Sequence, residues 1–276
     1  MRSVTLVTQH GSVRVGIGGW TFEPWRGPFY PPGLTQKREL EYASRRLTSI
    51  EINGTFYGAQ RPESFVRWRE ETPDGFVFSL KGPRFATNRR VLAEAGASVE
   101  RFLTGGVLQL KEKLGPINWQ MSSTKQYDPG DFEAFLKLLP TEMDGQALRH
   151  VVEVRHSSFV QPDFVALLRA YGVAAVMADH ATHPLLPDPT ASFVYLRLQR
   201  ASEEEDTGYS PAALKLWAER AQTWAAGKVP ADIPLIAKPE HRPRSRDVFI
   251  YMINGFKPKA PAAAMALIER LSVGKG

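Results

Sequence analysis

The strongest constraint on the fold is a regular alternation of short β-like segments with longer amphipathic segments. Eight segments rich in Val, Ile, Leu or Phe predict strands: Val13–Gly19, Ser49–Asn53, Phe76–Lys81, Ile117–Met121, His150–Arg155, Val173–Asp179, Ser192–Gln199 and Asp247–Asn254. Predicted helices lie between most of them: Gln36–Leu47, Pro62–Glu71, Ser98–Leu114, Asp131–Leu139, Pro162–Tyr171, a helix capped by Ser210, and Ala260–Leu271. Only the connection from Asp179 to Ser192 is expected to be irregular, because it carries three prolines.

This alternation indicates parallel strands joined by crossover helices, and eight such units predict an α/β fold, a single (βα)8 TIM-like barrel. The length of 276 residues is typical of that fold. An open sheet that binds a dinucleotide is the alternative. Its glycine-rich turn has one candidate, Gly16–Trp20, which leads into an aromatic and proline-rich stretch rather than a helix, so no nucleotide-cofactor motif is predicted. We expect an N-terminal extension over 1–12, the barrel over 13–273, and a basic loop insertion over 228–246.

Composition narrows the classes of function that such a barrel can serve. The chain has no cysteine, which excludes a thiolate metal site and a cysteine nucleophile and fits a reducing compartment. Residues 1–12 lack the apolar stretch of a signal peptide, and no apolar run approaches the ~20 residues that span a bilayer. We therefore expect a soluble, cytoplasmic protein without a membrane partner. The sequence makes no prediction of oligomeric state.

Polar residues gather where the predicted strands end. Alternate residues of a strand point to opposite faces, and in barrels the inward residues near the carboxyl end line the ligand site. In Ile50–Asn53, for example, the isoleucines are expected to face the helices while Glu51 and Asn53 point inward. Seven of the eight strands carry such residues at or beside the carboxyl end: Glu51, Asn53, Ser79, Lys81, Asn118, Gln120, Glu153, Arg155, His156, Asp179, Tyr195, Arg197, Gln199 and Asn254.

Three acids and three bases are among these inward residues, and buried charges need partners or a ligand. One interpretation is a mutually satisfied network, and the other is an enzyme site for a small polar or anionic substrate. In the enzyme interpretation Glu51, Glu153 and Asp179 are the acid/base candidates. The substrate-binding candidates are Asn53, Tyr57, Lys81, Gln120, Arg155, His156, Arg197 and Asn254, of which the lysine and the two arginines suit an anion.

The sequence leaves other interpretations open. The three carboxylates and His156 have the chemistry to hold a divalent metal, although their spacing matches no compact metal motif. The formal net charge of +6 and the basic segment 238–246 leave room for a protein that binds or processes nucleic acid. A third interpretation is a degenerate, non-catalytic barrel kept for binding.

Several motifs together resemble a known family. They are Gly18–Trp20 with Phe29–Pro31, Glu51–Tyr57, Phe78–Gly82, Lys113–Pro116 and Glu153–Phe159. From about Arg14 to Leu271 the chain is similar to the uncharacterised YecE-like proteins, the domain of unknown function 72 family. The resemblance implies a TIM-like barrel and supplies no established activity.

This chain departs from the family pattern at five positions near the predicted barrel mouth. Asn88 and Gln199 stand where the family often has histidine, Ser122 where it has proline, and Ile253 and Gly255 where it has aspartate. We therefore hypothesise a divergent member with reduced or shifted activity. The hypothesis predicts that Ile253→Asp and Gly255→Asp raise the affinity for a metal or ligand.

Overall fold

Eight parallel strands form a closed ring within the described part of the chain, which comprises residues 6–7, 11–239 and 245–273 of a computed structural model. The strands are β2 (Ser12–Gly18), β3 (Ser49–Ile52), β4 (Val77–Lys81), β5 (Leu114–Gln120), β8 (His150–Glu153), β9 (Ala174–Asp179), β10 (Phe193–Leu198) and β11 (Asp247–Met252). The ring closes because β2 pairs with both β3 and β11. A short strand, β1 (Leu6–Val7), adds antiparallel to β2. The predicted α/β barrel is confirmed.

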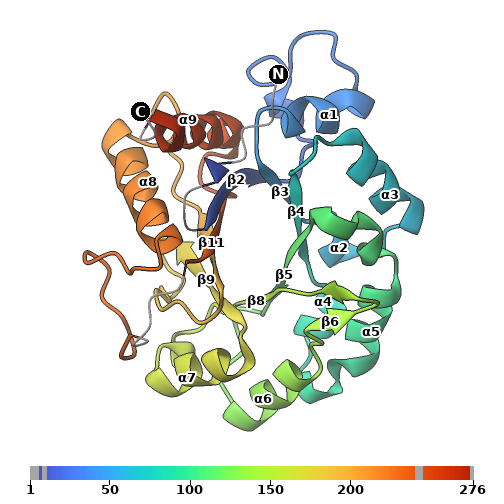
Figure 1. The fold of residues 1–276 in the computed structure, drawn as a ribbon, viewed down its shortest axis with the longest axis vertical. Helices are drawn as coiled ribbons and strands as arrows, with labels where there is room; N and C mark the ends of the chain where they lie inside the picture. Colours follow the sequence, from blue (N-terminus) through green and yellow to red (C-terminus); the bar gives the residue numbers. More distant parts are fainter. Residues whose placement is uncertain (1–5, 8–10, 240–244, 274–276) are drawn as a thin grey trace.

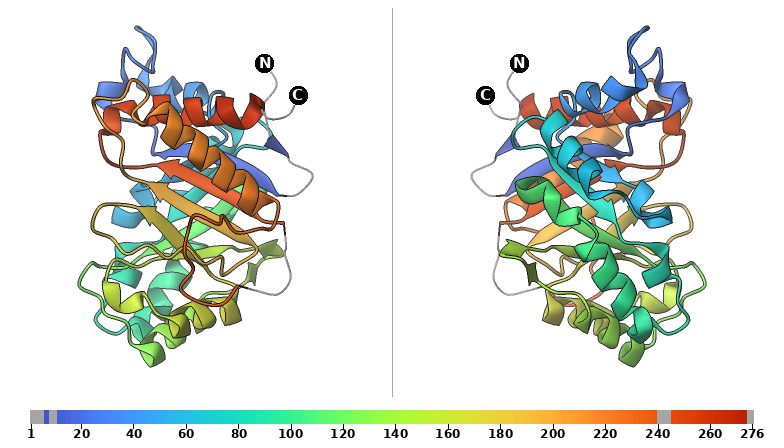
Figure 2. Two further views of the ribbon diagram at one scale, coloured as in Figure 1. Left: turned by 90° about the vertical axis from the view of Figure 1, so that its left-hand side faces the viewer. Right: turned by 90° about the vertical axis from the view of Figure 1, so that its right-hand side faces the viewer.

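Helices surround the strands (Figure 1). They are α1 (Glu39–Ser44), α2 (Gly54–Tyr57), α3 (Pro62–Glu71), α4 (Arg84–Thr87), α5 (Gly96–Thr104), α6 (Pro129–Lys137), α7 (Pro162–Tyr171), α8 (Pro211–Ala225) and α9 (Ala260–Val273). The predicted bounds of α3 and α7 are confirmed, and the Ser210 side chain accepts a hydrogen bond from Ala213 N–H, as the capping pattern predicts. Figure 2 shows α8 and α9 packed beside each other outside the barrel.

One predicted helix is wrong in its extent. Instead of running over Ser98–Leu114, α5 ends at Thr104, and a 3-10 segment (Val107–Lys113) follows before β5 begins at Leu114. The chain turns at Gly106, whose φ of 107° lies in a region that side chains disfavour, so the glycine ends the helix that the apolar stripe alone would continue. The short helices α2 and α4 and a hairpin of β6 (Glu142–Met143) and β7 (Gln146–Ala147) were not predicted.

Two connections are irregular: residues 180–192 and the basic loop over 228–246, as far as it is described. Residues 180–192 contain no helix, as their prolines predict. Asp188 in this connection accepts hydrogen bonds from the backbone N–H groups of Ile236 and Ala237, so it fastens the described part of the basic loop to the barrel. Residues 240–244 of the predicted insertion lie outside the described residues.

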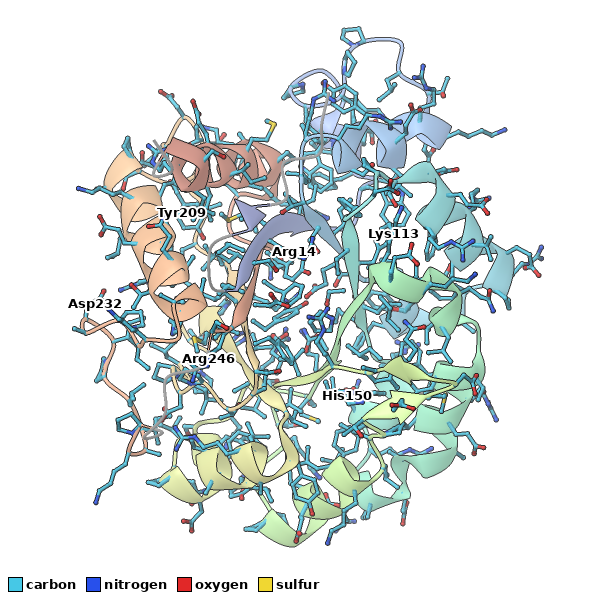
Figure 3. The ribbon with its side chains drawn as sticks, in the orientation of Figure 1. Arg14, Lys113, His150, Tyr209, Asp232 and Arg246 are labelled. Carbon is cyan, nitrogen blue, oxygen red and sulfur yellow. The ribbon has the colours of Figure 1, made fainter. Side chains whose placement is uncertain are left out.

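The amino end of the barrel is closed by its own side chains. Tyr195, Phe249 and Tyr251 are fully buried inside the ring of strands. Arg149 pairs with Asp247 at 3.1 Å, and Arg14, labelled in Figure 3, donates to the backbone of Gly75. The carboxyl end is consequently the end at which the barrel can hold a ligand. No helix in the described ranges is long and apolar enough to cross a membrane.

Candidate functional site

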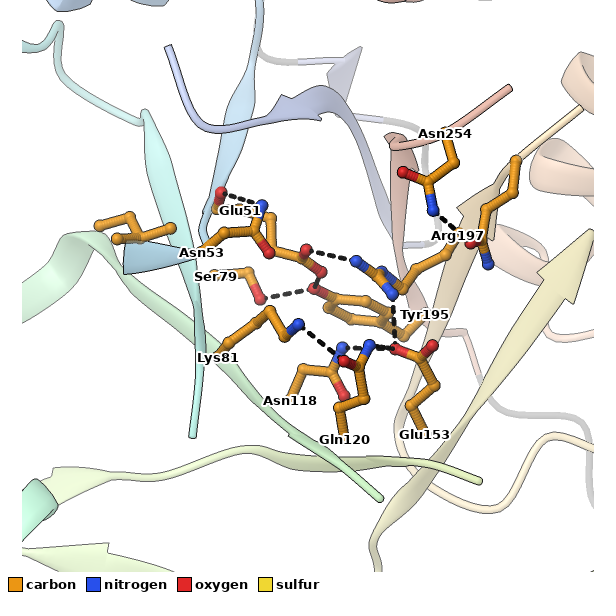
Figure 4. A network of polar contacts seen from close by, with 12 residues as sticks. Glu51, Asn53, Ser79, Lys81, Asn118, Gln120, Glu153, Tyr195, Arg197 and Asn254 are labelled. Atoms are coloured by element: carbon orange, nitrogen blue, oxygen red, sulfur yellow. Dashed lines mark hydrogen bonds and ion pairs between the residues drawn. The ribbon is translucent and has the colours of Figure 1, made fainter. Parts of the chain in front are cut away.

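Strand register brings polar side chains together at the carboxyl end of the barrel. Glu51 on β3 stands opposite Ser79 on β4, and Gln120 on β5 stands opposite Glu153 on β8. Both members of each pair point inward, because the alternating apolar residues face the helices. Figure 4 shows the polar network that results.

Arg197 on β10 is the centre of this network. Its Nη2 donates to Glu51 Oε1 at 3.0 Å and its Nη1 donates to Glu153 Oε2 at 2.6 Å. All three side chains are buried. The Tyr195 hydroxyl donates to the other oxygen of Glu51 at 2.6 Å, and burial followed by the charge of Glu51 raises the pKa of this tyrosine well above its ordinary value. Glu51 is therefore held by a guanidinium and a neutral phenol.

Glu153 is saturated with hydrogen bonds. Its Oε1 accepts from Arg155 Nε (3.0 Å) and Nη2 (2.8 Å), and its Oε2 accepts from Gln120 Nε2 (2.8 Å) and Asn118 Nδ2 (3.2 Å) as well as from Arg197. Burial alone would raise the pKa of Glu153, but Arg197 and Arg155 outweigh it and hold the pKa well below its ordinary range. The carboxylate is thus ionised and fully occupied at neutral pH.

Lys81 at the end of β4 is placed differently from the two arginines. Its Nζ donates to Gln120 Oε1 at 2.8 Å and lies 4.1 Å from the centre of the Phe56 ring, yet no carboxylate of the described residues forms an ion pair with it. Burial, followed by the charge of Arg197, lowers the pKa of Lys81 to about 8. The two glutamates are matched by two guanidiniums, so Lys81 adds an unmatched positive charge.

A cavity of about 670 Å³ opens above this network. The charged side chains of the described residues that line it are all cationic: Lys81, Arg155, Arg197 and Lys257. Trp20, Tyr57 and Trp68 form its aromatic wall, and Trp20 meets Trp68 edge to face with ring centres 5.2 Å apart. Glu51 and Glu153 are absent from the lining and lie beneath it. The cavity is therefore electropositive.

The structure brings most of the predicted binding residues together. Asn53, Tyr57, Lys81, Gln120, Arg155, Arg197 and Asn254 all line the cavity. His156 and Asp179 do not. The His156 Nδ1 lies 2.9 Å from Ser158 Oγ, and the Asp179 carboxylate forms an ion pair with Arg200 at 3.7 Å, while burial raises the pKa of this aspartate.

Sequence reasoning missed Lys257. It follows β11 by five residues and lies in a 3-10 turn, Lys257–Lys259, where strand alternation no longer gives the direction of a side chain. Its Nζ lies 4.2 Å from the centre of the Phe22 ring, and burial lowers its pKa. The contact between Phe22 and Lys257 joins residues far apart in the sequence, so no local sequence pattern predicts it.

The metal interpretation finds no support in the arrangement of acids and histidines. Across residues 11–239 and 245–273, no three histidine, aspartate or glutamate side chains come together in a group able to hold a metal ion. Glu51 and Glu153 are engaged by arginines, and His180 stacks on His183 with ring centres 3.7 Å apart. The cavity lining offers amine, guanidinium and amide groups instead, which suit anions.

The positions that depart from the family pattern have different surroundings. Ile253 lines the cavity, and Gln199 Oε1 accepts a hydrogen bond from Asn254, whereas Asn88 is exposed. Gly255 has a φ of 78°, and a Cβ placed there would lie 2.4 Å from the backbone N and O of Ala201. The proposed Gly255→Asp change therefore requires backbone movement, so it is not a clean test of the hypothesis.

Comparisons with known proteins agree on one family. The family model described as a protein of unknown function, DUF72, matches residues 14–275. The protein YecE of Escherichia coli (strain K12) is 31% identical over 150 residues, which are 53% of this chain and 50% of that protein, so the match spans about half the length of the relative. The crystal structure of a DUF72 family protein (TM1631) from Thermotoga maritima MSB8 has 23% identity, covers 94% of this chain and 99% of that one, and has a TM-score of 0.72. A DUF72 family protein (EF0366) from Enterococcus faecalis V583 has 16% identity, 95% and 98% coverage, and a TM-score of 0.67.

Proposed function

The chain belongs to the DUF72 family of proteins of unknown function, and we propose that the cavity at the carboxyl end of its barrel binds a small organic or inorganic anion. The observation that carries this proposal is the charge of the lining. Lys81, Arg155, Arg197 and Lys257 face the cavity, and none of the described lining residues is acidic. A cavity of this polarity attracts negative charge and excludes cations.

The hydrogen-bond donors of the lining support the same proposal. Lys81 has three N–H groups and donates one of them to Gln120. Arg155 donates from Nε and Nη2 to Glu153, and its Nη1 has no partner among the described residues. Buried or half-buried donors without partners favour a ligand that accepts hydrogen bonds. Carboxylate and phosphate oxygens meet this need.

The volume and the aromatic wall limit the size of the ligand. About 670 Å³ lies within the range of pockets for metabolites and cofactors, and it is too small for a folded partner. Trp20 and Trp68 offer an apolar surface next to the cations. We therefore propose a compact anion with an apolar or planar part.

In this proposal Glu51 and Glu153 position the cations. Each carboxylate holds a guanidinium in place, and the saturated, ionised state of Glu153 suits this role better than that of a proton donor. Asp179 and His156 stand apart from the cavity and have no part in it. The nucleic-acid alternative has no supporting observation in the described residues, since its basic segment includes residues 240–244, which lie outside them. A cytoplasmic location belongs to the proposal and rests on the absence of cysteine.

A thermal-shift screen tests the proposal. Phosphate, oxalate, oxamate and citrate would be compared with glucose, glycerol and magnesium at equal ionic strength. An anion present at 100 times its dissociation constant stabilises the fold by about 2.7 kcal/mol, which raises the melting temperature measurably. We expect at least one anion to stabilise the protein while the neutral compounds do not.

Matched variants locate the effect. Lys257→Gln removes a cavity cation that holds no buried carboxylate, whereas Lys215→Gln removes an exposed lysine of α8. Lys257→Gln is expected to reduce the anion shift and Lys215→Gln to preserve it. Equal shifts in both variants, or stabilisation by magnesium alone, would overturn the proposal.

A further inference from the structure

We infer that Lys81 is a nucleophile that forms an imine with the carbonyl group of a small oxo acid held in the cavity. The inference rests on the proposed anion site and names the class of compound it takes. It assigns a covalent role to a side chain that anion binding alone would use only for its charge.

The first support is the placement of the amine. Lys81 is 5% exposed, and its Nζ reaches the cavity from the last residue of β4, a rigid element. Gln120 Oε1 accepts one of its hydrogen bonds at 2.8 Å, and Gln120 is itself fixed because its Nε2 donates to Glu153. The Phe56 ring covers another side of the amine. Lys81 Nζ is therefore held in a defined position with donors left over (Figure 4).

The second support is the charge balance around Lys81. Arg197 and Arg155 take up the two buried glutamates, so Lys81 stands beside two guanidiniums without a carboxylate partner among the described residues. Burial and the neighbouring Arg197 lower the pKa of Lys81 to about 8, so a useful fraction of the amine is neutral near neutral pH. A neutral amine is the form that attacks a carbonyl carbon.

Lys113 shows that burial by itself does not free an amine for attack, although burial lowers the pKa of this lysine as well. It is as buried as Lys81, but its Nζ donates to the carbonyl oxygens of Arg69 and Thr72 at 2.6 Å each and to Thr72 Oγ1 at 3.2 Å. The Lys113 amine thus donates three hydrogen bonds within the protein, and Lys113 does not line the cavity. Lys113 is therefore a structural lysine and serves as an internal control within the same protein.

The chemistry of the step is balanced without any further reagent. The lone pair of the neutral Lys81 Nζ attacks the carbonyl carbon, and the π electrons of the C=O bond move to oxygen. The oxygen takes both amine protons and leaves as water while the C=N bond forms. Arg155, Arg197 and Lys257 would hold the carboxylate of the oxo acid. The resulting imine draws electrons from the adjacent carbon, which is the basis of lysine-dependent carbon–carbon bond and proton-transfer reactions.

Reductive trapping tests the inference. The 276-residue protein would be incubated with pyruvate or glyoxylate and sodium cyanoborohydride, which reduces the imine to a stable secondary amine. Peptide mapping by mass spectrometry then locates the adduct. We expect Lys81 to be labelled at least tenfold faster than any other lysine, with Lys113 unlabelled. Oxamate, which lacks a reactive carbonyl, should protect Lys81.

The controls separate this inference from the proposed function. Because the mapping uses the wild-type protein, the result does not depend on whether Lys81→Met folds. Lys257→Gln should slow the labelling of Lys81 by the oxo acids more than its labelling by neutral acetone, and the exposed control Lys215→Gln should change neither. A thermal shift with oxamate but uniform labelling of surface lysines would overturn the nucleophile and leave the anion site standing. Fast labelling of Lys81 by acetone and pyruvate alike, without a thermal shift from any of the anions, would overturn the oxo-acid assignment and the anion site together.

Discussion

Arg197 donates a 2.6 Å hydrogen bond to Glu153 in the interior of the barrel, where both side chains are buried. The same guanidinium reaches Glu51 on the opposite side of the barrel. One cation thereby links three strands beneath the cavity floor. The negative charge of the two glutamates is neutralised at this depth, so the cavity above them keeps its positive character.

Removing Arg197 is expected to destabilise the fold strongly. Arg197→Met leaves Glu51 without its guanidinium and removes one of the two guanidiniums that contact Glu153, and breaking one side of a buried ion pair typically costs 3–5 kcal/mol. Chemical denaturation would measure the free energy of unfolding. The control is Lys215→Met, whose exposed pair with Glu219 is worth less than about 1 kcal/mol. Losses of similar size in the two variants would show that the buried network does not stabilise the barrel.

The affinity for an anion is expected to fall as pH rises through the pKa of Lys81. The amine is cationic below about pH 8 and neutral above it, whereas the carboxylate of oxamate keeps its charge over this range. Titrations between pH 7 and 9.5 would measure the dissociation constant. We expect it to rise severalfold in the wild type and to change little in Lys81→Met. Parallel pH profiles would contradict a role for Lys81 in binding.

His150 is expected to make the fold sensitive to acid. Its Nδ1 accepts from Trp119 Nε1 at 3.1 Å, so its Nε2 carries the proton that faces Pro140 O. His150 is the first residue of β8 and is labelled in Figure 3. Burial lowers the pKa of His150 to about 4, although the Pro140 contact opposes this. The unfolded chain binds a proton near pH 6.5, so the contribution of neutral His150 is present above that pH and is lost as pH falls from about 6.5 to about 4.

Urea denaturation at several pH values in this window tests the role of His150. The wild type is expected to lose stability steadily on acidification, and His150→Gln, which keeps an acceptor for Trp119, is expected to start lower and decline less steeply. Identical slopes in the two proteins would assign the acid sensitivity to other groups.

Much of this molecule could be predicted from the sequence because each strand carries its own pattern. All eight strands lie within a few residues of their predicted bounds. Short apolar segments rich in β-branched residues, each bounded by amphipathic helical patterns, predict strands at these places. The same alternation placed Glu51, Lys81, Glu153 and Arg197 inside the barrel. The inward direction of a residue is a local property of a strand.

Properties that depend on distant partners could not be predicted in this way. The sequence offered Glu153 as an acid or base, but the arginines that saturate it come from its own strand end and from β10. His156 lies in the turn after β8, where strand alternation no longer gives the direction of a side chain. Asp179 is the last residue of β9, and its neighbours Ala174, Val176 and Ala178 pack inside the barrel, so alternation places Asp179 on the helix-facing side and the predicted inward direction was wrong. The prediction of one long helix over Ser98–Leu114 was wrong because the chain turns at Gly106, although the apolar stripe continues past it.

Any side chain at position 255 is expected to destabilise the fold. Its φ of 78° is strained for other residues, and a Cβ would clash with the Ala201 backbone, so Gly255→Ala should cost more than about 2 kcal/mol. Gly145 has a similar φ of 75° with open space around it, so Gly145→Ala should cost only about 1–2 kcal/mol. Thermal denaturation of both variants measures the difference. Equal losses would indicate that the clash with Ala201 is relieved at no cost, and Ile253→Asp alone remains the usable test of the family departures.

The central claim is that the cationic cavity binds a small anion, and titration calorimetry tests it most directly. Oxalate and phosphate would each be titrated at pH 7 into the wild type, Lys257→Gln and Lys215→Gln. The account predicts saturable binding of at least one anion at one site per chain, weakened severalfold or more in Lys257→Gln and unchanged in Lys215→Gln. Absence of binding by both anions, or an affinity that is equal in all three proteins, would contradict it.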